Sequence, residues 1–173
     1  MLTMEKVKIV LDADVIIHFS KAGRLSILPD ILPEYDYIVL DYVRDELRGD
    51  AKEQMDKMEA WMKKIKTIPF VPHGEMMREY ILLNKTKGKG ESACMAYCRF
   101  TNNVIGSSNL KDIKDYCILN KIAYLTTTDF LYYAYTRKIL TKKDCEDFVS
   151  AVLTKGSRIP QIDITTYTPN TLI

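Results

Sequence analysis

The sequence predicts an α/β fold, in which helices cover both faces of a mostly parallel sheet of four or five strands. Short apolar runs recur along the chain, and helical patterns separate most of them, as expected of repeated βα units. The first run is rich in β-branched residues and resembles a strand buried on both faces of a parallel sheet. The runs lie at residues 7–11, 37–40, 65–71, 103–106 and 122–125.

The clearest predicted helix follows Gly49, where Asp50 and Glu53 have the spacing of a capping box. An apolar stripe then repeats at intervals of three and four residues, and we expect it to belong to the core rather than to a cofactor site. The stripe consists of Met55, Met58, Trp61 or Met62, and Ile65.

The last predicted helix begins at a second capping box, formed by Thr141 and Asp144, and Gly156 is expected to end it. Residues 1–156 are therefore predicted to form a single domain. Residues 157–173 contain two prolines and no helical period, so we expect a C-terminal tail that runs over the surface of this domain or adds an edge strand.

Length and charge narrow the class of protein. A chain of 173 residues with 47% hydrophobic residues can bury one substantial core. A formal charge of +2 excludes a strongly polybasic binder, so a nucleic-acid contact would require a local basic patch. The N-terminus lacks a signal-peptide pattern and no apolar run reaches membrane-spanning length, which predicts a soluble cytoplasmic protein without a membrane partner.

The four cysteines show no pair of Cys-x-x-Cys motifs, and the chain has two histidines, so a structural zinc site is not expected. We interpret the cysteines as buried, reduced thiols, which suits a reducing cytoplasm.

Several carboxylates follow predicted strands or begin predicted helices. Asp12 ends the first strand, with Asp14 two residues on, and Glu46 comes soon after the second strand. Glu91 follows the loop Gly88-Lys89-Gly90 and begins an apolar helix, and Asp112 lies just past the run at 103–106. In a parallel sheet, ligands bind beyond the carboxyl ends of the strands, so these acids are expected near the functional site.

Converging carboxylates repel one another and raise some of their pKa values, which disfavours a purely structural role. A hard divalent cation, Mg²⁺ or Mn²⁺, resolves this conflict because it prefers oxygen ligands. Such an ion can hold a phosphodiester and lower the pKa of an attacking water. The predicted chemistry is therefore metal-assisted phosphoryl transfer, most simply hydrolysis.

Taken in order, these motifs resemble those of PIN-domain proteins, including VapC-like toxins. The motifs are Asp12-Ala13-Asp14-Val15, Glu46, Gly90-Glu91-Ser92-Ala93 and Asn109-Leu110-Lys111-Asp112-Ile113, within residues 7–155. The resemblance implies a three-layer αβα sandwich and a Mg²⁺- or Mn²⁺-dependent ribonuclease, often a homodimer and often paired with an antitoxin protein. It also implies a metal site formed by Asp12, Glu46, Glu91 and Asp112, with Asn109 as polar support.

Three positions depart from the family pattern. Ala13 replaces a frequent Ser or Thr, Glu91 replaces a frequent Asp, and Ser107-Ser108 replaces a pair such as Thr-Arg. The Glu91 side chain is longer than Asp by one methylene, so the metal geometry of the family is in question at this position.

Each candidate also has a structural interpretation. Asp14 has the character of an N-cap, Asn109 and Asp112 have capping-box spacing, and Asp129 is interpreted mainly as a cap and secondly as a reserve ligand. Glu46 could lie on a solvated helix face beside Arg44 and Arg48. The lysines of the loop before Glu91 either guide an RNA backbone or are simply solvated; these are Lys85, Lys87 and Lys89.

Two other functions remain open. Asp12-x-Asp14 after a strand also fits a haloacid-dehalogenase-like phosphatase, with Asp12 as nucleophile, Asp14 as general acid-base, and Ser107 in the second motif. A PIN-like module could also bind RNA or protein without cleaving it, because fold does not fix function.

Overall fold

The computed structural model describes residues 5–173 as an α/β fold built on one sheet of five parallel strands, which confirms the predicted fold class. The strand order is β3-β2-β1-β4-β5. The strands are β1 (Lys8–Leu11), β2 (Asp36–Leu40), β3 (Ile65–Ile68), β4 (Val104–Gly106) and β5 (Tyr124–Leu125).

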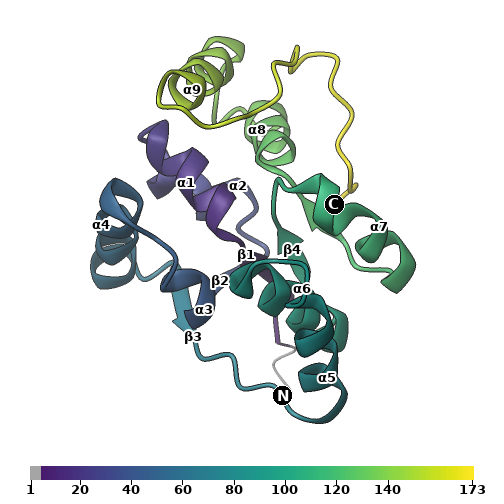
Figure 1. Cartoon of the computed structure of the whole chain (residues 1–173). Coiled ribbons are helices and arrows are strands. Elements are labelled where there is room, and N and C mark those ends of the chain that lie inside the picture. The colour runs from purple at the N-terminus through teal and green to yellow at the C-terminus, as the bar shows by residue number, and fades with distance from the viewer. Residues whose placement is uncertain (1–4) are drawn as a thin grey trace.

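Helices cover both faces of the sheet and complete a three-layer αβα sandwich (Figure 1). Helices α1, α4, α8 and α9 pack together on one face, and α5, α6 and α7 pack on the other. The helical elements are α1 (Ala13–Lys21), η1 (Leu25–Ile27), α2 (Leu28–Ile31), α3 (Asp41–Arg44), α4 (Gly49–Lys57), η2 (Met58–Met62), α5 (Gly74–Leu83), α6 (Lys89–Thr101), α7 (Leu110–Asn120), α8 (Thr127–Thr136) and α9 (Lys142–Thr154).

The strand order reverses direction next to β1. The chain adds β2 and β3 on one side of β1 and then adds β4 and β5 on the other. Open α/β sheets bind ligands at such a switch point, beyond the carboxyl ends of the two strands concerned. Asp12 lies there, and its main-chain N–H donates to the Gly106 carbonyl oxygen over 2.8 Å, which extends the β1–β4 ladder by one bond.

The interior explains why β1 is so apolar. Ile9, Val10 and Leu11 are completely buried, because helices cover both faces of this central strand. On the α1 side, the Phe19 ring makes edge-to-face contacts with Phe130 and Phe148 and so joins α1 to α8 and α9.

Two predicted strands are shorter than expected. The run at 65–71 is a strand only to Ile68, because Pro69 has no N–H with which to continue the ladder. The run at 122–125 pairs from Tyr124 onward. The second strand is confirmed almost to the residue.

The helix predicted after Gly49 is present as α4, but two details of its prediction were wrong. Arg48 is the N-cap of α4 and no side chain caps this end, so the expected Asp50–Glu53 capping box does not form. The helix widens into a π-helical turn at Met58 and ends at Met62, so Ile65 belongs to β3 instead of the stripe. Trp61 is 83% exposed and lies outside the core.

The C-terminal part agrees with its prediction. Thr141 and Asp144 form the expected capping box of α9, and Gly156, with a φ of +80°, follows its end. The tail then runs past α8 and ends beside α7 without forming a helix or strand (Figure 1). All four cysteines are free and buried. Within residues 5–173, no helix has the length and apolar character needed to cross a bilayer.

Candidate carboxylate site

A cavity of about 420 Å³ lies at the carboxyl ends of the central strands, and five carboxylate residues line it. The lining comes from the residue after β1, α1, the turn after α3, the loop before α6, the first turn of α6, and the start of α7. Its residues are Asp12, Ala13, Asp14, Ile17, Glu46, Thr86, Lys87, Gly88, Glu91, Asn109 and Asp112. The structure therefore brings together all four predicted metal ligands, although they are separated by up to a hundred residues in sequence.

Asp12 is held from both sides of its carboxylate. One oxygen accepts from the Ala13 N–H over 2.8 Å, which makes Asp12 the N-cap of α1, and the other accepts from the Ser107 hydroxyl over 3.3 Å. The residue is 7% exposed. Burial raises the pKa of Asp12 well above its usual range, and the charge of Asp14 raises it further.

Asp14 lies in the first turn of α1, so it is not the N-cap that its sequence position suggested. Its Oδ1 accepts from the Val15 N–H over 2.7 Å and its Oδ2 accepts from the Ser108 N–H over 2.8 Å. Burial raises the pKa of Asp14, although these N–H groups oppose the change. Ser107 bridges the two aspartates, since its hydroxyl also lies 3.5 Å from Asp14 Oδ2.

Glu46 lies in the turn after α3, so it is not on a helix face beside Arg44 and Arg48. Its Oε1 accepts from the Gly90 N–H over 2.9 Å, and so binds the start of α6. A Cβ atom at residue 90 would stand 2.9 Å from both carboxylate oxygens of Glu46. Glycine therefore permits the close approach of the Glu46 carboxylate at this position, and an unusual φ angle is not involved.

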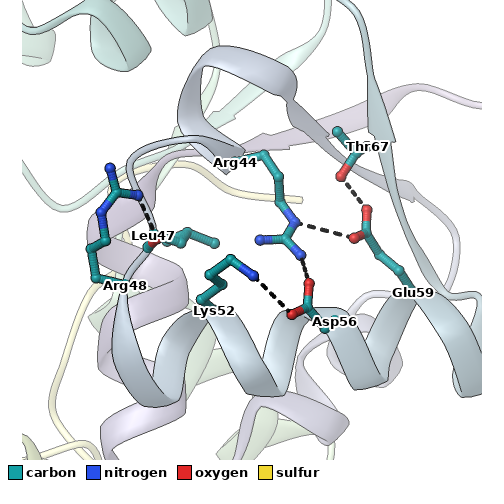
Figure 2. A network of polar contacts seen from close by, with 7 residues as sticks. All are labelled: Arg44, Leu47, Arg48, Lys52, Asp56, Glu59 and Thr67. Atoms are coloured by element: carbon teal, nitrogen blue, oxygen red, sulfur yellow. Dashed lines mark hydrogen bonds and ion pairs between the residues drawn. The ribbon is translucent and has the colours of Figure 1, made fainter.

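The turn that carries Glu46 is anchored by a network around Arg44 (Figure 2). The Arg44 guanidinium pairs with Asp56 on α4 and donates to Glu59 on η2 over 3.1 Å. Glu59 also accepts from Thr67 on β3. Arg44 has a mostly buried side chain, with 14% of it exposed, so this network fixes the path of the chain between α3 and α4.

Glu91 lies in the first turn of α6 and is 9% exposed. Its Oε1 accepts from the Asn109 side-chain amide over 2.7 Å. Burial raises the pKa of Glu91 to about 7, with a further contribution from the charge of Asp112. At neutral pH this carboxyl therefore carries a proton in a substantial fraction of molecules.

Asp112 differs from the other acids because a cation neutralises it. Lys87 Nζ lies 3.0 Å from its Oδ1, and the Asn109 amide donates to its Oδ2 over 2.7 Å. Lys87 and Asn109 lower the pKa of Asp112. Asn109 thus bridges Glu91 and Asp112, and at its position as N-cap of α7 it forms no side-chain capping bond. The expected Asn109–Asp112 capping box is therefore absent.

Of the three loop lysines, Lys87 lines the cavity, whereas Lys85 and Lys89 are exposed residues outside its lining. Asp129 also lies outside the lining. Its carboxylate belongs to the α8 capping box with Thr126, and it also accepts from Tyr167 and Asn170 of the tail. The cap interpretation is confirmed.

Ser108 contributes to the site in a way that the sequence did not indicate. Besides its N–H bond to Asp14, its hydroxyl accepts from the Thr127 N–H and donates to the Thr127 hydroxyl, each over 2.9 Å. The Thr127 hydroxyl in turn contacts His18 Nδ1 over 2.9 Å. Small polar residues directly after a strand were the available signal, but their partners come from distant segments.

The chemistry of the donors fits a hard divalent cation, because the cavity presents carboxylate and amide oxygens and its buried acids repel one another. Within residues 5–173, however, no three His, Cys, Asp or Glu side chains are grouped closely enough to hold a metal ion. The cavity therefore combines suitable ligand types with carboxylates that are spaced apart.

Comparison with known proteins adds no family assignment, since no protein-family profile and no curated protein matches the chain.

Proposed function

We propose that this protein is a PIN-like endoribonuclease that hydrolyses RNA phosphodiester bonds with Mg²⁺ or Mn²⁺. One observation carries the proposal: five carboxylate residues line a single cavity at the switch point of a parallel sheet, and Lys87 is the one cation in the lining of that cavity within residues 5–173. This excess of negative charge is costly without a cation to offset it.

Asp12, Glu46, Glu91 and Asp112 are the proposed ligands, with Asp14 beside them. When bound, the ion would polarise the phosphodiester and lower the pKa of an attacking water. The protein's own groups hold the acids in place: Ser107 orients Asp12, Gly90 orients Glu46, and Asn109 orients Glu91 and Asp112. Lys87 supplies positive charge for a phosphate oxygen.

Cleavage of a labelled single-stranded RNA by the purified chain tests the proposal. We expect cleavage with Mg²⁺ or Mn²⁺, none in EDTA, and a loss of about a hundredfold or more in Asp12→Asn, because several kcal/mol of stabilisation would disappear. Glu53→Gln, at an exposed position of α4, is the matched control. Absence of metal-dependent cleavage across RNAs of varied sequence would contradict the proposal.

A second candidate is a PIN-like module that binds RNA without cleaving it. The spacing of the carboxylates favours this candidate, since no three of the possible ligands in residues 5–173 are grouped for a metal. RNA binding that is unchanged by Mn²⁺, together with absence of cleavage, would identify it.

The phosphatase alternative has less support. Asp129, the acid that would have to serve its late motif, is fully buried and engaged by the tail, and Glu46 and Glu91 would have no role. Turnover of p-nitrophenyl phosphate that depends on Asp14 would favour the phosphatase instead.

The toxin role, the antitoxin partner and the homodimer belong to the same proposal and derive from the resemblance to PIN-domain toxins. Expression of the chain alone in a bacterial host is expected to arrest growth, and Asp12→Asn to relieve the arrest. Sedimentation of the purified protein tests the dimer.

A further inference from the structure

A second cavity, also of about 420 Å³, adjoins the carboxylate cavity. The two share Ile17 and Glu46 in their linings, so they meet at the surface between α1 and the turn after α3. The other lining residues of the second cavity are Ser20, Lys21, Arg48, Asp50, Ala51 and Lys155. Its charge is opposite to that of its neighbour, because three cations face two acids.

The two lysines of this cavity have no carboxylate partner within residues 5–173. Lys21 Nζ donates to the Lys155 carbonyl oxygen over 2.8 Å and to the Ser157 hydroxyl over 2.7 Å. Lys155 Nζ donates to the Lys21 carbonyl oxygen over 2.7 Å. These neutral acceptors hold the ammonium groups in place without cancelling their charge, and Lys155 keeps donors free.

Arg48 is similarly placed. It donates to the carbonyl oxygens of Leu47 and Asp45, and it forms no ion pair among the residues of the structure that are described. Figure 2 shows the contrast with Arg44, whose guanidinium is engaged by two carboxylates four residues earlier. Arg48 is exposed, so its charge is available to a ligand.

Two further features of the cavity favour an anion. The N-terminus of the nine-residue helix α4 opens here without a side-chain cap, and the first N–H groups of a helix have no partners within it. Ser20 is 3% exposed, and its hydroxyl has no hydrogen-bond partner in residues 5–173. Ser20 lines the same cavity as three cations that have no carboxylate partner within residues 5–173, and a ligand with acceptor oxygens there would offer its hydroxyl a partner.

We propose that this second cavity binds a phosphate of an RNA strand whose neighbouring phosphodiester lies in the carboxylate cavity. The inference rests on the proposed function and extends it. A strand with a phosphate at every nucleotide can occupy two adjoining cavities at once, and it needs cations in the one that lacks a metal. Lys21, Arg48, Lys155 and Ser20 would hold this phosphate and so set the direction in which the strand leaves the site.

Binding of a fluorescein-labelled 12-nucleotide single-stranded RNA, measured by anisotropy in EDTA, tests the inference without any cleavage. Arg48→Gln and Lys155→Gln should each weaken binding about fivefold at ~0.1 M salt, and each should reduce the slope of log K against log salt by about 0.7. Lys66→Gln is the matched control, because Lys66 is an exposed lysine of β3 outside both cavities and has no ion pair within residues 5–173.

Ser20→Ala gives a sharper readout. The hydroxyl has no hydrogen-bond partner within residues 5–173, so its removal should leave the melting temperature unchanged or raised, yet weaken RNA binding about threefold. A purely structural role would produce the opposite pattern, namely a lower melting temperature with unchanged binding.

Failure of this inference can be distinguished from failure of the proposed function. RNA binding that depends on Arg48 and Lys155, without metal-dependent cleavage, would overturn the nuclease proposal and support the phosphate site. Cleavage in the wild type with unchanged binding and salt slope in Arg48→Gln, Lys155→Gln and Ser20→Ala would overturn the phosphate site. The phosphate site would also be overturned if these three variants lost binding to a poly-glutamate peptide while their binding to RNA was unchanged.

Discussion

Glu91 and Asp12 both have buried carboxyl groups. Glu91 is followed in α6 by a run of buried, mostly apolar residues. Burial opposes the ionised form of each side chain, and the nearby acids oppose it further. In the metal-free protein these residues therefore reduce the stability of the fold at neutral pH. A functional site that is destabilising in this way can be recognised by substitutions that stabilise the protein while removing its activity.

Glu91→Gln is expected to stabilise the metal-free protein at pH 7.5 by up to about 3 kcal/mol, because the pKa of Glu91 is raised from 4.5 to about 7. Because this pKa is raised in the folded state, the folded protein binds more protons than the unfolded chain. The free energy of unfolding of the wild type is therefore undiminished below pH 4.5, and it falls as the pH rises to about 7. The glutamine can still accept from Asn109.

Urea unfolding at pH 5 and pH 7.5 measures this effect as the difference between variant and wild type. The stabilisation should be present at pH 7.5 and mostly gone at pH 5. Glu53→Gln should show no such difference, since that side chain is exposed. A destabilised Glu91→Gln at pH 7.5 would mean that the carboxylate is stabilising where it lies.

Gly90→Ala is expected to displace the Glu46 carboxylate, because the new Cβ would lie 2.9 Å from its oxygens. Glu46 is an exposed, flexible side chain that can move away, and alanine favours the helix by about 1 kcal/mol. We therefore expect stability within about 1 kcal/mol of the wild type, but RNA cleavage reduced to the level of Glu46→Gln.

The double variant distinguishes this explanation from a general disturbance of α6. If alanine acts through Glu46, Gly90→Ala combined with Glu46→Gln should cleave RNA no more slowly than Glu46→Gln alone. Additive losses would show that Gly90 affects the site by another route.

At the scale of elements, a buried acid of α8 holds the C-terminal tail against the rest of the fold. Asp129 accepts from the Tyr167 hydroxyl over 2.9 Å and from the Asn170 N–H over 2.8 Å while it also caps α8. Thr171 extends the attachment, since its hydroxyl donates to the Tyr124 carbonyl oxygen of β5 over 2.6 Å. The tail thereby covers the edge strand of the sheet, which would otherwise present unpaired main-chain groups.

Asp129→Asn should destabilise the protein by about 2–4 kcal/mol, because an amide group would face donors that now point at a buried carboxylate. Limited proteolysis should then cleave the tail faster than in the wild type. Asp144→Asn is the matched control: Asp144 occupies the same capping-box position in α9, and its bonds go to Thr141 and Arg24 rather than to the tail, so a loss of about 1 kcal/mol is expected. Equal losses would contradict the proposed attachment.

Local signals explain which elements could be predicted from the sequence. The apolar run of β1 and the Thr141–Asp144 capping box are each contained in a few neighbouring residues, and both are confirmed. The start of α4 was predicted to within a residue, but its cap was not, because Asp50 and Glu53 have the right spacing while Arg48 takes the N-cap position. Trp61 has the right spacing for the core, but the π-helical turn moves it to the surface.

The grouping of the four acids was predictable because each follows a strand or begins a helix beside the same edge of a parallel sheet. The hydrogen-bond partners of the acids could not be predicted. Glu46 meets Gly90 across 44 positions, and Asp129 meets Asn170 across 41. Such bonds depend on how the helices pack, and no local pattern in the sequence encodes them.

At the scale of the whole molecule, the five parallel strands point the same way, and the buried acids gather beyond one end of the sheet. A cation that binds this end of the folded chain, but not the unfolded chain, stabilises the entire domain by linkage. The acids come from α1 and its N-cap directly after β1, from α6 and α7, and from the turn after α3, so such binding would tie both helical layers to the sheet.

Addition of Mn²⁺ to the metal-free wild type should therefore raise its melting temperature. A free concentration of about 100 times the Kd corresponds to about 2.7 kcal/mol, or about 5–10 °C for a chain of this size. EDTA should reverse the rise, and Asp12→Asn should abolish it although that variant starts from a higher melting temperature. Glu53→Gln should respond like the wild type. If Mn²⁺ raises the melting temperature of Asp12→Asn as much as that of the wild type, the ion binds elsewhere, and Asp12 is not one of its ligands.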